Sequence, residues 1–139
     1  MSRLWVIDTN VIVSGLIYPR STPGRIIDAG LTGLFDFAYD SRILAEYRDV
    51  LSRPKFGFSP GAIEGYLFVL LSFPPASPGD LKVSLPDPDD VALAEVALAT
   101  PDRILVTGNR RHFSAVEKLG LRVINPTAAL EVLDSTSEA

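Results

Sequence analysis

The amino-acid sequence predicts an α/β fold with a mainly parallel central sheet. Leu4–Ile7 and Ile104–Thr107 are continuous apolar runs rather than alternating ones, which is typical of strands buried on both faces. Patterns typical of strands also alternate along the chain with patterns typical of helices, and short loops join them. Parallel strands need crossover connections of this kind, so the helices are expected to cover the faces of the sheet.

Local start and stop signals give the order of the remaining elements. Hydroxyl, carboxylate or amide caps beside an early proline indicate helix starts, and glycine or proline indicates helix ends. The predicted elements after Leu4–Ile7 are a helix from Ser21 to about Gly30, a strand within 34–40, a helix capped by Ser41 and ending near Arg53, a helix from Ser59 to about Phe73, a short strand at Val83 and Leu85, a helix from Asp87 to about Ala99, the strand Ile104–Thr107, a helix over about Ser114–Leu119, a strand Leu121–Ile124 and a helix from Asn125 to Leu133.

Composition limits the class of protein. A chain of 139 residues with 47% hydrophobic content fits one globular domain over residues 1–134, with a frayed polar tail at 135–139. The absence of cysteine excludes disulfides and thiolate metal sites, and no apolar run approaches the roughly 18 residues of a membrane span. The N-terminus shows no signal-peptide pattern, so we expect a cytoplasmic protein. The net charge of −4 does not by itself indicate nucleic-acid binding.

Polar side chains follow the two buried strands where each of them ends. Asp8 comes directly after Leu4–Ile7, and Asn109 lies two residues beyond Thr107. Ligands of open parallel sheets bind beyond the carboxyl ends of the strands. If the two strands are neighbours, Asp8 and Asn109 therefore share one crevice.

Two further carboxylates are expected to face this crevice. Glu46 lies at the border of the apolar stripe of its helix, whereas Asp49 points to the opposite side. In the DPDD sequence, Asp87 is expected to be the N-cap, which places Asp90 in the first turn of the helix. Negative charge is tolerated there because it opposes the positive end of the helix dipole.

Each of these residues also has a purely structural interpretation. Asp87, Asp89 and Asp90 could serve only as capping residues, Asp8 could bond to amides of the next loop, and Glu46 could reach solvent from the helix border. Their convergence favours a different explanation, because carboxylates that share one sheet edge disfavour one another's ionised form. A bound divalent cation removes that conflict.

The candidate ligands indicate which cation this would be. They are all oxygen donors, and the chain has no cysteine and one histidine, which favours Mg²⁺ or Mn²⁺ over Zn²⁺. An open site of this kind is suited to phosphodiester hydrolysis, in which the metal ion polarises the phosphate and activates water.

The ordered motifs resemble those of a known family. A strand ending in DTN, a helix bearing Glu46, the DPDD sequence and a strand continuing into VTGNRRHF resemble PIN-domain nucleases, most closely the VapC-like toxin components of bacterial type II toxin–antitoxin systems. The resemblance covers about Arg3 to Leu133. It implies a small three-layer α/β/α sandwich and an endoribonuclease that depends on Mg²⁺ or Mn²⁺.

The resemblance also implies the roles of site residues. Asp8, Glu46, Asp90 and Asn109 form the implied catalytic set, and Asp8, Asp90 and Glu46 would hold the metal. Asn109 departs from the family pattern, which often has aspartate at this position, so the set carries three formal negative charges rather than four. Asp87 or Asp89 could compensate for the missing charge.

Basic residues near the acids are the predicted RNA contacts. Arg110 and Arg111 follow Asn109 directly and are expected to contact backbone phosphates, with a solvated rim as the alternative. Asn10 and Thr107 complete the predicted substrate-binding set. For His112 we favour a structural role over acid–base catalysis. Further positive charge on or after the Glu46 helix comes from Arg48, Arg53 and Lys55.

Partners are implied by the resemblance as well. They are RNA, a cognate antitoxin protein and a second copy of the chain in a homodimer. The segment YLFVLLSF, residues 66–73, is apolar enough to cover a partner, although we favour burial in the core.

Two other functional classes remain open at this point. In an aspartyl-phosphate phosphatase Asp8 would be the nucleophile, but Asn10 stands where a second aspartate is expected, and the lysines are limited to Lys55, Lys82 and Lys118. In a non-catalytic RNA- or protein-binding module the fold would be retained and the chemistry lost through Asn109.

Overall fold

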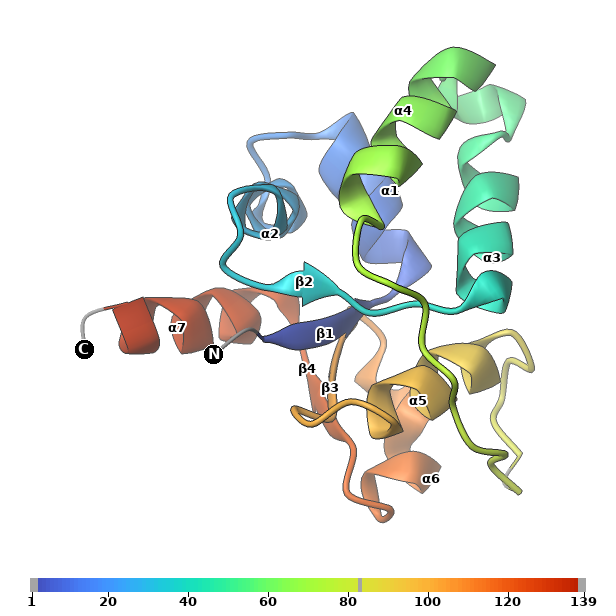
Figure 1. Cartoon of the computed structure of the whole chain (residues 1–139), viewed down its shortest axis with the longest axis vertical. Helices are drawn as coiled ribbons and strands as arrows, with labels where there is room; N and C mark the ends of the chain where they lie inside the picture. The colour runs from blue at the N-terminus through green and yellow to red at the C-terminus, as the bar shows by residue number, and fades with distance from the viewer. Residues whose placement is uncertain (1–2, 83, 138–139) are drawn as a thin grey trace.

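A four-stranded parallel sheet lies at the centre of the computed structural model, which describes residues 3–82 and 84–137 and confirms the predicted α/β class (Figure 1). The strand order is β2–β1–β3–β4, and every neighbouring pair is parallel. The strands are β1 (Leu4–Ile7), β2 (Asp36–Phe37), β3 (Ile104–Val106) and β4 (Arg122–Ile124).

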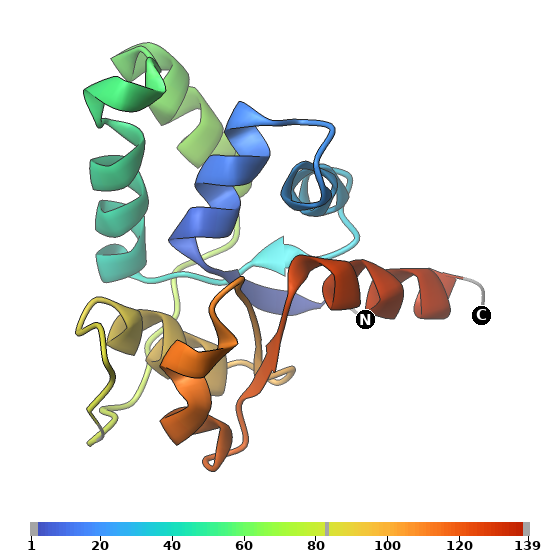
Figure 2. The same ribbon diagram turned by 180° about the vertical axis from the view of Figure 1, so that it is seen from behind.

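Helices cover both faces of this sheet. Helices α1 to α4 gather on one side and α5 and α6 on the other (Figure 1), and α7 packs against α2, as the opposite view shows (Figure 2). The helices are α1 (Thr9–Ile17), α2 (Thr22–Leu31), α3 (Ser41–Leu51), α4 (Pro60–Leu70), α5 (Asp90–Leu98), α6 (Ser114–Glu117) and α7 (Pro126–Ser137), with short 3₁₀ turns at Pro54–Phe56 and Arg110–Phe113.

The strand order places a topological switch point between β1 and β3. From β1 the chain crosses to β2 on one side, and from β3 it crosses to β4 on the other. Connections that leave in opposite directions open a crevice beyond the carboxyl ends of the two central strands. Val6 pairs with Leu105 and Ile7 with Val106, so β1 and β3 end side by side.

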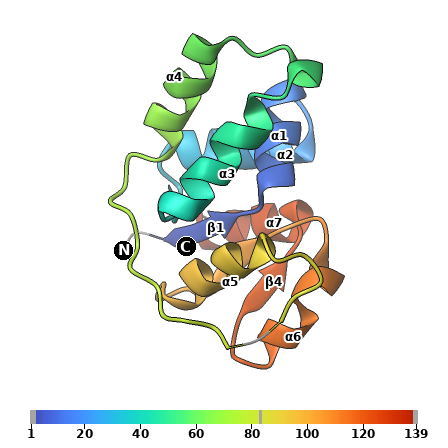
Figure 3. The same cartoon turned by 90° about the vertical axis from the view of Figure 1, so that its right-hand side faces the viewer.

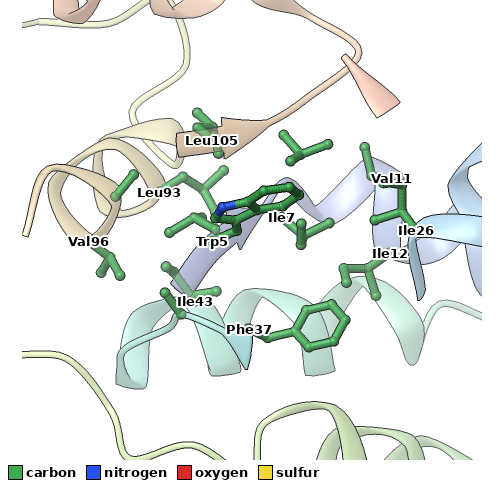
Figure 4. Packing of buried hydrophobic residues seen from close by; sticks show 14 of the residues in the cluster. Trp5, Ile7, Val11, Ile12, Ile26, Phe37, Ile43, Leu93, Val96 and Leu105 are labelled. Carbon is green, nitrogen blue, oxygen red and sulfur yellow. The ribbon is translucent and has the colours of Figure 1, made fainter. Parts of the chain in front are cut away.

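The core explains why the two central strands are apolar without alternation. Trp5, Ile7 and Leu105 are buried, because helices pack on both faces of the strands that carry them. Figure 4 shows Trp5 between Leu93 of α5 and the side chains of the opposite layer. The Trp5 ring also stacks on Phe35, with the ring centroids 5.0 Å apart.

Helix α1 is the element that the sequence patterns did not predict. Its residues Thr9–Ile17 include a run of β-branched side chains that is equally typical of a strand. Gly15 lets α1 and α2 approach closely, since a Cβ at that position would lie 2.8 Å from the Pro23 carbonyl oxygen. Because α1 begins directly after Asp8, the turn at the end of β1 has no additional residues.

Several predicted boundaries differ from those in the structure. Asp40, rather than Ser41, caps α3, because its carboxylate accepts hydrogen bonds from the Arg42 and Ile43 amides. Helix α4 ends at Leu70, α5 begins at Asp90 rather than near Asp87, and α7 continues past Leu133 to Ser137. Of the short strand predicted at Val83 and Leu85, Val83 lies outside the described residues and Leu85 is buried in a loop.

The segment 66–73 is divided between core and surface. Leu67, Leu70 and Leu71 are buried, but Phe68 and Val69 are exposed to 82% and 55%. The predicted burial in the core therefore holds for only part of the segment. In the ranges 3–82 and 84–137, no helix is both long and apolar enough to cross a lipid bilayer.

Candidate active site

An acidic hollow opens at the switch point, beyond the ends of β1 and β3. Its volume is about 220 Å³, and it receives side chains from the end of β1, from α3 and from the start of α5. Its lining includes five carboxylates and, among the described residues, one cationic side chain. The residues are Asp8, Thr9, Asn10, Glu46, Val50, Arg53, Asp87, Asp89, Asp90 and Leu93.

Asp8 is the most firmly held of the acids. Its backbone amide donates to the Val106 carbonyl oxygen at 2.9 Å, and its Oδ2 accepts a 2.6 Å hydrogen bond from the Thr107 hydroxyl. Burial raises the pKa of the Asp8 carboxyl, while Thr107 and the amides of Thr9 and Asn10 oppose that rise. A carboxylate with this environment is oriented by the protein but is not neutralised by it.

Asp90 faces the same hollow from the first turn of α5. Burial, reinforced by the nearby charges of Asp8 and Asp87, raises its pKa to about 6. His112 Nδ1 lies 3.6 Å from Asp90 Oδ2 and favours the ionised form. The contact places His112 beside an acid of the hollow, and its structural role stays a prediction.

Glu46 completes the set from α3. Burial raises its pKa, and the charges of Asp89 and Asp49 add to the effect, whereas Arg53 opposes it. Asp87 also has a local task, because its Oδ1 accepts a 3.0 Å hydrogen bond from the Asp89 amide. The structural and functional interpretations of the DPDD acids are therefore compatible, since Asp87 shapes the turn and still lines the hollow.

Asn109 and Thr107 occupy places that sequence spacing could not distinguish. Asn109 is exposed and is absent from the lining of the hollow, and only its backbone amide is tied in, donating to the Thr107 hydroxyl at 3.0 Å. Thr107 is buried and is committed to Asp8, which leaves it little surface for a substrate. Besides Asp8, Glu46 and Asp90, the hollow contains the carboxylates of Asp87 and Asp89, and the side chain of residue 109 does not contribute to it.

The predicted basic contacts fall into three groups. Arg110 is exposed and bound to Glu117 through two 3.1 Å hydrogen bonds, while Arg111 is exposed with no ion pair to any described residue. Arg48 lies outside the hollow and pairs with Glu64 of α4 at 3.0 Å. Of these predicted basic residues, all in the described part of the chain, Arg53 is the one that lines the hollow.

Tyr47 is a supporting residue that the sequence patterns did not single out. Its hydroxyl donates to the carbonyl oxygen of Ile7, the residue before Asp8. The ring is fully buried, and burial raises the pKa of the phenol. The hydrogen bond joins α3, which carries Glu46, to the end of β1. A tyrosine within an apolar helical stripe was the available signal, because a buried phenol needs a polar partner.

The donor set fits a divalent cation in charge but is not arranged around one. Five carboxylates share the hollow, and the pKa values of Asp8, Glu46 and Asp90 are raised, which favours their neutral forms. A bound dication would lower these pKa values and favour the ionised carboxylates. In the part of the chain that the structure describes, however, no three acidic or histidine side chains lie close enough together to hold one ion. Side-chain movement would have to accompany binding.

The sequence is similar to one known protein family. The chain matches the PIN domain family over residues 5–111, which includes every acid of the hollow and three of the four strands. No curated protein matches the sequence of this chain. PIN domains are generally nucleases, hydrolases that typically use divalent metal ions. Since the match spans well over half of the chain and the fold agrees with it, this protein belongs to the PIN domain family.

Proposed function

We propose that this protein is an endoribonuclease that hydrolyses RNA phosphodiester bonds and depends on Mg²⁺ or Mn²⁺. The observation that carries the proposal is the convergence of five carboxylates from three parts of the chain on one hollow at the switch point. Such a concentration of negative charge is unfavourable unless a cation joins it. Arg53 supplies one positive charge against five negative ones, so an external cation is needed.

The residues of the chain divide the work of the site. Asp8, Asp90 and Glu46 would hold the ion, which when bound supplies a Lewis acid for the phosphate and an activated water. Thr107 fixes the orientation of Asp8, and His112 does so for Asp90. Arg110 and Arg111 stand on the exposed turn after β3, where they would bind backbone phosphates and offset the repulsion between RNA and the acids.

Two observations favour a second candidate, a PIN-fold module that binds RNA or protein without cutting. The acids are not arranged for a metal among the described residues, and Asn109 lies outside the hollow. The phosphatase alternative has less support, since Lys55, Lys82 and Lys118 do not line the hollow. A phosphoryl-aspartate mechanism needs a cation there to hold the phosphate, and among the described lining residues Arg53 is the one cationic side chain.

The test compares cleavage and binding on the same substrates. Fluorescent single-stranded RNA and the matching DNA are incubated with wild type and Asp8→Asn in Mg²⁺, Mn²⁺ or EDTA. The proposal expects RNA cleavage by wild type with either metal, and none with EDTA or with Asp8→Asn. RNA binding without cleavage under every metal condition would establish the binding module instead. DNA cleavage at an equal rate would correct the substrate class.

Thermal unfolding gives a readout that does not need a substrate. Mn²⁺ at about 100 times its dissociation constant stabilises a protein that binds it only when folded by about 2.7 kcal/mol. We expect the melting temperature of the wild type to rise with Mn²⁺ and that of Asp8→Asn to stay unchanged. A wild type that shows no rise with either ion contradicts the metal site.

The biological role in the proposal is that of a toxin with a cognate antitoxin. It rests on the motif resemblance and is tested by inducing wild type and Asp8→Asn in bacterial cells, with and without the protein encoded by the adjacent gene. Growth arrest by wild type alone, relieved by the neighbour, supports it. The proposed homodimer is supported by the exposed Phe68 and Val69 on α4, and sedimentation of Phe68→Ser against wild type tests it.

A further inference from the structure

We propose that Glu95 is a positioning residue that sets the spacing of the carboxylates in the acidic hollow. It does so by holding together α3, α5 and the loop between α4 and α5, the three segments that carry four of the five acids. The proposal rests on the proposed metal-dependent activity, because the spacing matters only if those acids bind one ion. Its test is therefore built around metal affinity.

Glu95 uses both of its carboxylate oxygens. Oε1 accepts a 2.6 Å charge-assisted hydrogen bond from Arg42 of α3, and Oε2 accepts a 2.6 Å hydrogen bond from the Leu81 amide in the loop. Arg42 in turn binds the Asp40 carboxylate at 2.8 Å, and Asp40 caps α3. We call Asp40, Arg42, Glu95 and the Leu81 amide the clamp.

The clamp is built into the interior rather than attached to the surface. The Glu95 side chain is 5% exposed, and the Asp40 side chain 9%, whereas Arg42 is 47% exposed. A carboxylate at such depth is unfavourable unless it is paired and hydrogen-bonded, and Glu95 meets both conditions. Its geometry is therefore fixed by partners in two other segments.

Each segment that meets at Glu95 continues into the acidic hollow. Arg42 and Glu46 are four residues apart and therefore lie on the same face of α3. The loop leads from Leu81 to Asp87 and Asp89, and α5 itself begins with Asp90. Figure 3 shows α3 beside α5, with the loop passing the N-terminal end of α3 on its way to α5.

A second hollow lies next to the clamp. About 420 Å³ of open space separates part of α3 from the start of α5. Arg42 and Glu46 line one side, and Pro88, Asp89, Val91 and Ala92 line the other. The Arg42–Glu95 pair links the two helices beside this gap.

The clamp also acts against a force that the site itself generates. Glu46, Asp87 and Asp89 line the same hollow, so their like charges repel one another when they are ionised. Repulsion of this kind drives α3 away from the start of α5 when no cation is bound. Contacts that orient ligands from outside the first layer typically change metal affinity by 10- to 100-fold when they are removed.

The experiment measures Mn²⁺ affinity by calorimetry on the full-length protein, together with the melting temperature of the metal-free protein. Glu95→Gln and Arg42→Gln each remove the ion pair. The double variant lacks both of its partners and shows whether the two single effects come from the same contact. Arg48→Gln is the matched control, since Arg48 is also on α3 and pairs with Glu64 of α4, which carries no acid of the hollow. Arg42→Lys retains the positive charge.

We expect Glu95→Gln and Arg42→Gln each to weaken Mn²⁺ binding about 10-fold, with the double variant no weaker than the worse single one. Arg42→Lys should recover part of the loss, and Arg48→Gln should match wild type. Hydrogen exchange of the Leu81 amide in metal-free protein should also be faster in Glu95→Gln. If Glu95→Gln does not fold, Arg42→Gln decides, because its side chain is half exposed.

The proposal is overturned if both Gln variants melt at lower temperature but bind Mn²⁺ within twofold of wild type. That result would leave the clamp as a stabilising contact without a positioning role. It would also leave the proposed function intact, since wild type would still bind the ion. A wild type that neither binds Mn²⁺ nor cleaves RNA removes the proposed function, and the positioning role with it.

Discussion

Two groups of carboxylates lie near one another, the clamp and the acidic hollow, and both include residues at or on α3 and α5. They differ in how their charge is balanced. In the clamp, Asp40 and Glu95 share Arg42, and their other oxygens accept backbone amides. In the acidic hollow, Asp8 and Asp90 have hydroxyl and imidazole neighbours, and among the described residues no arginine or lysine forms an ion pair with them. Burial raises the pKa of both carboxyls, and for Asp90 the nearby charge of Asp8 adds to the rise.

The difference teaches that buried acid alone does not identify a functional site. Glu95 is as deeply buried as Asp8, yet its partners within the chain are complete. Asp8 is oriented by Thr107 but has no cationic partner of the kind that Glu95 has in Arg42, as the proposed cation site requires.

The largest expected effect comes from removing an acid of the hollow. Asp8→Asn should lower kcat/KM for RNA by at least about 100-fold, equal to about 2.7 kcal/mol of transition-state stabilisation. The fold should persist, because an amide can still accept from Thr107. Initial rates with Mn²⁺ measure the effect, and Asp28→Asn on the exposed side of α2 is the control. Equal losses in both variants would show that the effect is not specific to the acidic hollow.

Removing an acid of the clamp should lower the stability of the metal-free protein. Glu95→Gln leaves Arg42 without its buried partner and should lower the free energy of unfolding of the metal-free protein by about 1 to 3 kcal/mol. Urea unfolding monitored by Trp5 fluorescence measures it. An unchanged midpoint would show that the clamp is not a stabilising pair.

Asp90→Asn should raise the stability of the metal-free protein at pH 7, by about 1 to 3 kcal/mol. The reason is that the pKa of Asp90 is raised from 3.8 to about 6, so folding opposes its ionisation. The folded wild type then binds more protons than the unfolded chain, and it loses this contribution as pH rises from about 4 to about 6.

The pH dependence gives a sharper form of that prediction. The stability difference between Asp90→Asn and wild type should be small near pH 4, grow up to about pH 6 and stay constant above it. Urea unfolding in chelator-treated buffers measures both proteins across this range. A stability difference that does not vary with pH would show that folding does not raise the pKa of Asp90.

The smallest effect is expected at the basic rim. Arg111→Gln should weaken RNA binding a few-fold and reduce the salt slope by about one, because one phosphate contact is lost. Arg110→Gln should have less effect, since Arg110 is already bound to Glu117. Fluorescence anisotropy with Asp8→Asn as background, at several salt concentrations, separates binding from cleavage. Identical slopes for all proteins would remove the phosphate role.

Sequence patterns predicted the parts of the fold that depend on local signals. The strand Leu4–Ile7 was predicted with its bounds, and the convergence of Asp8, Glu46 and Asp90 followed from strand ends and helix faces. Helix α1 was missed, because its β-branched run is compatible with either structure and tertiary packing decides between them.

Long-range side-chain partners could not be predicted in the same way. Arg42 and Glu95 are 53 positions apart, and no local periodicity connects them. The displacement of Asn109 from the hollow had no sequence signal either, since spacing gives the strand end but not the direction of the turn that follows it. The contribution of Asp87 and Asp89 depends in turn on where α5 begins.

Asp8 has no spare chain on either side, since β1 ends at Ile7 and α1 begins at Thr9. The position of the Asp8 side chain therefore depends directly on how Trp5, Val6 and Ile7 pack in the core. A substitution inside the molecule that tilts β1 is therefore expected to displace the Asp8 carboxylate within the acidic hollow, although the substituted residue itself does not line that hollow.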